Sequence, residues 1–226
     1  MIGDPIIVRE QVMEETMLYK DVPVLKYTIR YPEFSSAVFR IAANEMNRYY
    51  RTRAALQRQR DRQILYPQAV RDHDYATSHD YPFHAHEAMT VHTVTYNQNC
   101  AVSLYADNYQ FTGGAHGNTI RSSDTWDLKN SQRQPLTRFF AAPVPYPAFV
   151  LESVNAQIAA QIAEGTGMYF DDYQKNVAQN FNPRSYYLNP HGVVVYFQQY
   201  QIAPYASGIP EFTLPWSAEV REPYCR

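Results

Sequence analysis

The sequence gathers glycines in one short loop that also holds a histidine. No glycine occurs between residues 4 and 112, and then Gly113, Gly114 and Gly117 fall within five positions, around His116. Glycine tolerates positive φ and lets another part of the chain approach closely, so this density predicts a turn with demanding geometry. The loop lacks the Gly-Lys-Ser/Thr sequence and the following helix of a phosphate-binding loop. His116 is therefore either a ligand contact at the tip or a hydrogen-bonded structural histidine.

A second group of histidines invites a metal hypothesis. His84, His86 and His92 have the same parity, so they share one face of a predicted strand, and histidines two positions apart can bind zinc together. No His-Glu-x-x-His or Cys-x-x-Cys spacing accompanies them. They stay weak metal candidates, with a half-exposed strand as the alternative.

Signatures of nucleophilic catalysis are missing. The sequence has no Gly-x-Ser-x-Gly and no Ser-x-x-Lys. The adjacent Asp171 and Asp172 diverge on a helix, where the first turn favours carboxylates. We therefore predict no catalytic residue and no cofactor.

The elements that must position these residues predict an α+β fold. Strands are expected over 6–18, 24–31, 83–96, 100–112 and 118–128, with a helix in the proline-free window 33–66. This order predicts an N-terminal antiparallel sheet with one long helix packed on it. The second half predicts helices over 147–164 and 171–180 and strands over 185–188, 192–201 and 211–216. We expect two domains, 1–117 and 118–226, the second a mixed strand and helix part.

The long helix is predicted to be amphipathic. Its apolar face would carry Phe34, Val38, Ile41, Ala42, Tyr49 and Leu56, and its opposite face Arg40, Arg51, Arg58 and Arg62. The arginine face fits either an anion-binding surface or a solvated outer face.

Charge, hydropathy and cysteine content narrow the class of protein. The 226 residues carry a net charge of −2, which excludes a dominant non-specific nucleic-acid binder. No run approaches the roughly 18 apolar residues of a membrane span, and Met1–Pro5 lacks the features of a secretory signal, which leaves the compartment open. Cys100 and Cys225 are either two thiols or a disulfide that ties down the tail. The 20 tyrosines are typical of a protein with a binding face, but several fall at structural positions of the predicted strands and helix, so their number alone does not mark one.

Three ordered motifs carry a resemblance to a known family. Residues 109–117, Tyr-Gln-Phe-Thr-Gly-Gly-Ala-His-Gly, resemble the Tyr-x-Tyr-Thr-Gly-Gly-Ala-His signature of the RsiV-type extracytoplasmic domain. Residues 200–208 match its Tyr-x-Ile-Ala-Pro-Tyr-Ala-x-Gly motif, and 126–140 resemble the stretch between them. In that stretch, Asn130-Ser131 stands where glycine is usual and Arg138 where aspartate is usual.

The resemblance implies binding or sensing at the bacterial envelope. The family's domain occurs in an anti-sigma factor that senses lysozyme and beside the catalytic domain of the peptidoglycan deacetylase PdaC. We therefore expect a non-catalytic module whose ligand is a lysozyme-like protein or a peptidoglycan fragment. Its binding face would include Tyr109, Gly113, Gly114, His116 and Tyr205. One alternative is a wall-glycan hydrolase that uses His116 with an unidentified acid, and another is a deacetylase accessory domain. A third is that the motifs only fix the fold.

Overall fold

The computed structural model describes residues 6–225, so Met1–Pro5 and Arg226 lie outside the description. The chain divides into two compact units. The N-terminal unit holds 6–92 and 106–120, and the C-terminal unit holds 93–105 and 121–225. The α+β prediction is confirmed, whereas the division at residue 117 stays a prediction.

A long hairpin opens the N-terminal unit. Strand β1 (Ile7–Tyr19) pairs antiparallel with β2 (Val22–Ser35), from Ile7 opposite Ser35 to Tyr19 opposite Val22. Lys20 and Asp21 join them with positive φ angles of 49° and 64°, as a two-residue hairpin turn requires.

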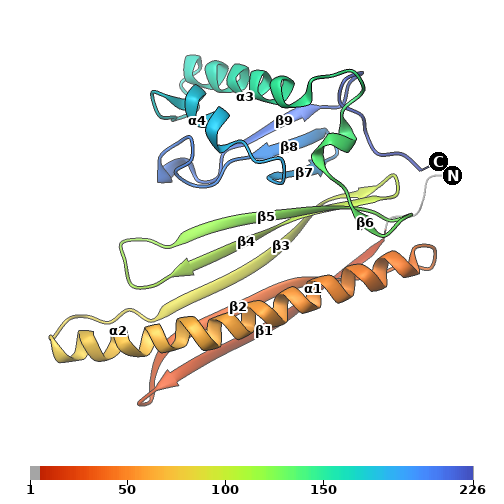
Figure 1. The fold of residues 1–226 in the computed structure, drawn as a ribbon. Helices are drawn as coiled ribbons and strands as arrows, with labels where there is room; N and C mark the ends of the chain where they lie inside the picture. Colours follow the sequence, from red (N-terminus) through yellow and green to blue (C-terminus); the bar gives the residue numbers. More distant parts are fainter. Residues whose placement is uncertain (1–5, 226) are drawn as a thin grey trace. The chain divides into compact units, whose positions relative to one another are not determined.

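The predicted helix is longer than its proline-free window. Helix α1 (Arg40–Arg60) continues through a π-helical turn (Asp61–Leu65) into α2 (Tyr66–Ser78), and the pair runs along β1 and β2 (Figure 1). Pro67 does not end it, because proline at the first turn of a helix needs no N–H donor. The π-helical turn just before it shifts the hydrogen-bond pattern so that Pro67 enters at that first turn.

The predicted apolar face of α1 is wrong for its large aliphatic residues and right for Ala42, which is buried. Val38, Ile41 and Leu56 are 68%, 75% and 59% exposed, and Phe34 belongs to β2. The buried face carries Ala42, Ala43, Met46, Tyr50 and Ala54. The alanines let the helix approach the sheet closely, and the large side chains of Met46 and Tyr50 fill the space beside them.

One sheet takes strands β1 to β6 in sequence order. Its later strands are β3 (His86–Gln98), β4 (Ala101–Phe111), β5 (Asn118–Asp127) and β6 (Gln132–Arg133). The sheet is mixed rather than wholly antiparallel, since β2 pairs parallel with β3 from Leu25 opposite His86 to Arg30 opposite Val91. The long helix is the crossover connection that parallel pairing needs.

The C-terminal unit adds a second, three-stranded sheet in the order β7–β8–β9. Helix α3 (Tyr146–Ala163) lies along this sheet (Figure 1), and α4 (Tyr173–Asn180) follows with Asp172 at its N-cap. The strands are β7 (Tyr186–Asn189), β8 (Gly192–Tyr196) and β9 (Glu211–Pro215). Strand β8 is shorter than the predicted 192–201, because Phe197 leaves the ladder and the chain turns over 198–201.

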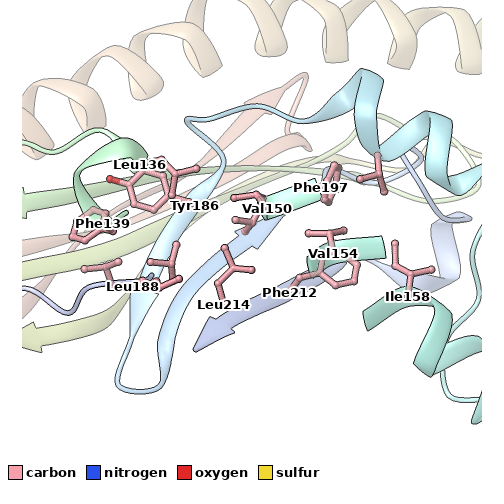
Figure 2. Packing of buried hydrophobic residues seen from close by; sticks show 14 of the residues in the cluster. Leu136, Phe139, Val150, Val154, Ile158, Tyr186, Leu188, Phe197, Phe212 and Leu214 are labelled. Atoms are coloured by element: carbon pink, nitrogen blue, oxygen red, sulfur yellow. The ribbon is translucent and has the colours of Figure 1, made fainter. Parts of the chain in front are cut away.

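The core of this unit lies between α3 and the second sheet. Val150, Val154 and Ile158 of α3 pack against Leu188 and Leu214, among other apolar residues of the strands (Figure 2). Three α3 residues at helical spacing thus supply the helix side of the core. Within residues 6–225, no helix has the length and hydropathy that a bilayer crossing needs.

Candidate functional site

A cavity of the C-terminal unit lies beside the C-terminal tail. Its volume is about 470 Å³, within the range of small-molecule sites. We call it the tail pocket. Its lining includes Tyr224, Cys100 and the polar residues Asn99, Asp127, Lys129, Asn130, Gln134, Arg138, Arg221 and Glu222.

A disulfide fixes the tail that forms one wall of this pocket. Cys100 and Cys225 are bonded; their Cα atoms are 5.4 Å apart, and the two residues are 125 positions apart in sequence. The alternative that the sequence left open, a tethered C-terminus, is thus the arrangement in the structure. Further upstream, the Arg221 N–H donates to the Phe139 carbonyl at 2.8 Å.

Glu222 anchors the same tail through its carboxylate. Its Oε1 accepts hydrogen bonds from the Tyr96 hydroxyl at 3.0 Å, from Asn99 Nδ2 at 3.0 Å and from Gln98 Nε2 at 3.2 Å. Burial is the main reason that the pKa of Tyr96 rises to about 12, so its hydroxyl stays a neutral donor. Three donors on one carboxylate hold the pocket wall in place.

In the tail pocket, the carboxylates have hydrogen-bond donors within the protein, whereas the two arginine side chains form no ion pair within the described part of the chain. Asp127 Oδ1 accepts the backbone N–H of Lys129 at 2.8 Å, and Glu222 has the donors described above. Arg138 and Arg221 are exposed, and among residues 6–225 neither forms an ion pair with a carboxylate. An incoming anion therefore meets two guanidinium groups without displacing a protein carboxylate.

The glycine loop predicted from sequence has a clear structural role. A side chain at Gly117 would overlap the ring of Tyr109, and Gly113 has φ +86°, a conformation that favours glycine. His116 is exposed, and its Nδ1 donates to the Gly117 carbonyl at 2.9 Å. The absence of a side chain at Gly117 thus leaves the space that the Tyr109 ring occupies. The exposure of His116 counts against a hydrolase that uses this histidine.

The five predicted contact residues fall in different units. Tyr109, Gly113, Gly114 and His116 belong to the N-terminal unit. Tyr205 belongs to the C-terminal unit, where it opens a short 3₁₀ turn and lies 5.8 Å from the Tyr200 ring, centroid to centroid. The loop residues form one local cluster, and Tyr205 forms another.

The histidines proposed as metal candidates take separate environments. His84 precedes β3 and is exposed, whereas His86 is buried with Nε2 3.2 Å from Asp72. His92 donates from Nδ1 to the Arg30 carbonyl at 2.9 Å. Within residues 6–225, no group of three or more His, Cys, Asp or Glu side chains is arranged to hold a metal ion.

Several tyrosines have structural partners that account for part of their excess. Arg121 lies over the Tyr105 ring, 3.7 Å from its centroid, and pairs with Glu211. The Tyr187 hydroxyl donates to the same Glu211 at 2.8 Å. These aromatic residues pack and bridge the C-terminal unit, so the tyrosine count by itself does not mark a binding face.

The tail pocket was missed from sequence, although two of its residues carried a signal. Asn130 and Arg138 are the positions where this chain departs from the motif that it resembles. Both line the pocket.

Comparisons with known proteins relate both halves of the chain to described families. Residues 19–119 match the family described as deacetylase PdaC, and residues 138–217 match a protein family of unknown function, DUF3298. No curated protein matches the chain. The relation to PdaC and to a family of unknown function is confirmed, and the RsiV-type assignment stays a prediction.

Solved structures of DUF3298 proteins share the fold. A member from Bacteroides fragilis is 15% identical with a TM-score of 0.67, covering 96% of this chain and 94% of that one. A protein from Pseudomonas aeruginosa is 19% identical with a TM-score of 0.63, covering 94% and 91%. Together these findings relate the chain to the DUF3298 family of unknown function.

Proposed function

We propose that this chain is a non-catalytic module that binds a fragment of peptidoglycan in the tail pocket. The observation that carries the proposal is the pairing of Arg138 and Arg221 on a cavity of about 470 Å³. Amide side chains of Asn99, Asn130 and Gln134 complete the polar lining.

The pocket chemistry fits such a fragment group by group. Peptidoglycan fragments carry carboxylates on their peptide stems and lactyl groups, and amides and hydroxyls on their sugars. Guanidinium groups bind carboxylates through paired hydrogen bonds. Asn and Gln side chains both donate and accept, which suits acetamido groups and hydroxyls.

The disulfide supports an extracytoplasmic location. Structural disulfides form and persist in oxidising compartments and are rare in the cytosol of most organisms. The Cys100–Cys225 bond would therefore form outside the cytoplasm, where wall fragments occur. Residues 19–119 match the family described as deacetylase PdaC, and a relation to a peptidoglycan deacetylase fits the same setting.

Binding rather than catalysis is favoured by how the pocket carboxylates are held. Glu222 anchors the tail through three donors, and Asp127 caps a turn through the Lys129 N–H. Both carboxylates serve the architecture of the pocket wall. The exposed guanidinium groups are left to contact the ligand.

Calorimetric titration with a purified disaccharide-peptide muropeptide tests the proposal. We expect saturable binding that Arg138→Ala and Arg221→Ala each weaken about tenfold, the size typical of a lost charged hydrogen bond. The matched control is Arg184→Ala, an exposed arginine of the same unit that does not line the pocket.

Two further arms separate the alternatives. Titration with lysozyme tests a protein ligand. The variant His116→Ala tests the alternative site that was predicted from sequence, which comprises Tyr109, Gly113, Gly114, His116 and Tyr205. Muropeptide binding that His116→Ala weakens and the arginine variants leave unchanged would move the site to the glycine loop. Binding to lysozyme alone would replace the proposed ligand.

A further inference from the structure

The N-terminal unit contains a second cavity, separate in its residues from the tail pocket. It has a volume of about 370 Å³ and lies between α1 and strands β2, β3 and β4. Ile29, Ala54 and Ala106 give it apolar walls. We call it the helix groove.

The charge of the helix groove has one sign. Arg53 and Arg60 line it from α1, and none of the described residues that line it is Asp or Glu. The two arginines are seven positions apart, which places them on one face of the helix about 10 Å apart along its axis. Because arginine side chains are long, an anion that lies between the two positions can contact both guanidinium groups.

Other arginines of this helix face glutamates instead. Arg51 lies 3.7 Å from Glu33, and Arg58 and Arg62 both pair with Glu15 of β1. Most arginines of the predicted arginine face thus form ion pairs with the β1–β2 hairpin. Arg53 and Arg60 differ from these arginines because they line the helix groove.

The contacts of the two groove arginines leave guanidinium donors for a ligand. Arg53 Nη1 donates to the Tyr49 hydroxyl at 2.9 Å, and Arg60 Nη2 donates to Gln110 Oε1 at 3.1 Å. Arg60 Nη1 is also 3.9 Å from the buried Asp61, a longer separation than a direct hydrogen bond. Each guanidinium has five N–H donors, so these contacts do not exhaust either group.

The sheet side of the groove supplies hydrogen-bonding groups. The Thr90 hydroxyl donates to Asn108 Oδ1 at 3.0 Å, and Asn108 Nδ2 donates to the Ile120 carbonyl at 3.2 Å. These bonds fix Thr90 and Asn108 in position without closing the groove. Together with His92, they place polar groups opposite the two arginines.

We propose that the helix groove binds a small ligand that carries a carboxylate or phosphate group on a compact apolar body. The anion would contact Arg53 and Arg60, and the apolar body would lie against Ile29, Ala54 and Ala106. This site differs from the tail pocket in unit, residues and ligand chemistry.

Titrations of the full chain with benzoate, phenyl phosphate and benzyl alcohol test the proposal. The first two probes combine an anion with an apolar ring, and the alcohol keeps the ring without the charge. In amide-resolved NMR spectra we expect saturable shifts at Thr90 and Asn108 with an anionic probe and at least tenfold weaker shifts with the alcohol. The tighter of the two anionic probes assigns the anion.

Arginine variants make the test specific to the groove. Arg53→Ala and Arg60→Ala should each weaken the anionic probe about tenfold, whereas Arg71→Ala, an exposed arginine of α2 outside the groove, should leave it unchanged. Because all three side chains are exposed, the folded state of each variant is checked by its thermal transition. Equal binding of the alcohol, no binding of either anion, or equal losses in all three variants would overturn the proposal.

Discussion

Glu222 and Tyr96 lie 126 positions apart in sequence, yet the Tyr96 hydroxyl donates to the Glu222 carboxylate at 3.0 Å. This bond ties the C-terminal tail to strand β3 within the C-terminal unit. The disulfide holds the tail three residues further on. One wall of the tail pocket is therefore formed before any ligand arrives, which lowers the ordering cost of binding.

Glu222→Ala should loosen that wall. The substitution removes the acceptor shared by Tyr96, Gln98 and Asn99 and leaves the buried Tyr96 hydroxyl with fewer partners, which costs about 1–3 kcal/mol of unfolding free energy. Denaturant unfolding measures the loss. Glu164→Ala, an exposed glutamate of the same unit, is the control, and equal losses in the two variants would contradict the anchoring role.

Breaking the disulfide should weaken both the fold and the pocket. A bond that closes a loop of this length stabilises the folded state by about 2–5 kcal/mol. We expect Cys225→Ser to lower the unfolding free energy by that amount and to weaken muropeptide binding. A reducing agent should reproduce both effects in the natural chain and add nothing in the variant. Unchanged binding after reduction would show that the tail does not shape the site.

Asp61 should make stability depend on pH. Its side chain is 1% exposed in the π-helical turn, and burial raises its pKa from 3.8 to about 6. A raised pKa means that the native state holds a proton that the unfolded state has released. The contribution of this group to the unfolding free energy is therefore highest below pH 4 and falls as the pH rises to about 6, by at most about 3 kcal/mol.

Asp61→Asn removes this titration. We expect the variant to lose less stability than the natural chain between pH 4 and pH 6.5, measured by denaturant unfolding at each pH. Comparing the two chains cancels the other carboxylates, such as Glu15, whose pKa is lowered chiefly by the Tyr27 hydrogen bond. The exposed Asp171→Asn is the matched control. Identical pH profiles for the natural chain and Asp61→Asn would rule out the effect.

The glycine loop allows a test between two neighbouring glycines. Gly117→Ala would force the outer end of the half-buried Tyr109 ring to move and should cost about 1 kcal/mol, whereas the nearest atom to a side chain at Gly114 is 3.9 Å away. We therefore expect a lower melting temperature for Gly117→Ala and little change for Gly114→Ala. Adding Tyr109→Ala to Gly117→Ala should cost less than the two single losses combined. Equal melting temperatures for Gly117→Ala and Gly114→Ala would contradict the close packing of the Tyr109 ring on Gly117.

Local patterns predicted most elements because local sequence determines them. The predicted helix over 147–164 corresponds to Tyr146–Ala163, and the strand over 118–128 to Asn118–Asp127. The features that failed depend on neighbours in space. The continuation of the long helix past Pro67 depends on the π-helical turn, and the choice of Ala54 rather than Leu56 for the buried face depends on close packing against the sheet.

The tail pocket could not be predicted from sequence because its walls come from distant segments. Asn99, Arg138 and Arg221 meet only after the disulfide and the Glu222 bonds bring the tail to the hairpin. The glycine loop could be predicted because its signal is local. Its geometry is confirmed at Gly113, whose φ is +86°, but its part in ligand binding stays a prediction.

The most direct test of the account is amide-resolved NMR mapping of a muropeptide titration on the full chain. We predict saturable shifts at Asn99, Asn130 and Arg221, which line the tail pocket, and a loss of those shifts in the chain that carries both Arg138→Ala and Arg221→Ala. Shifts that gather elsewhere, or that persist unchanged in this double variant, would contradict the assignment of the tail pocket as the binding site.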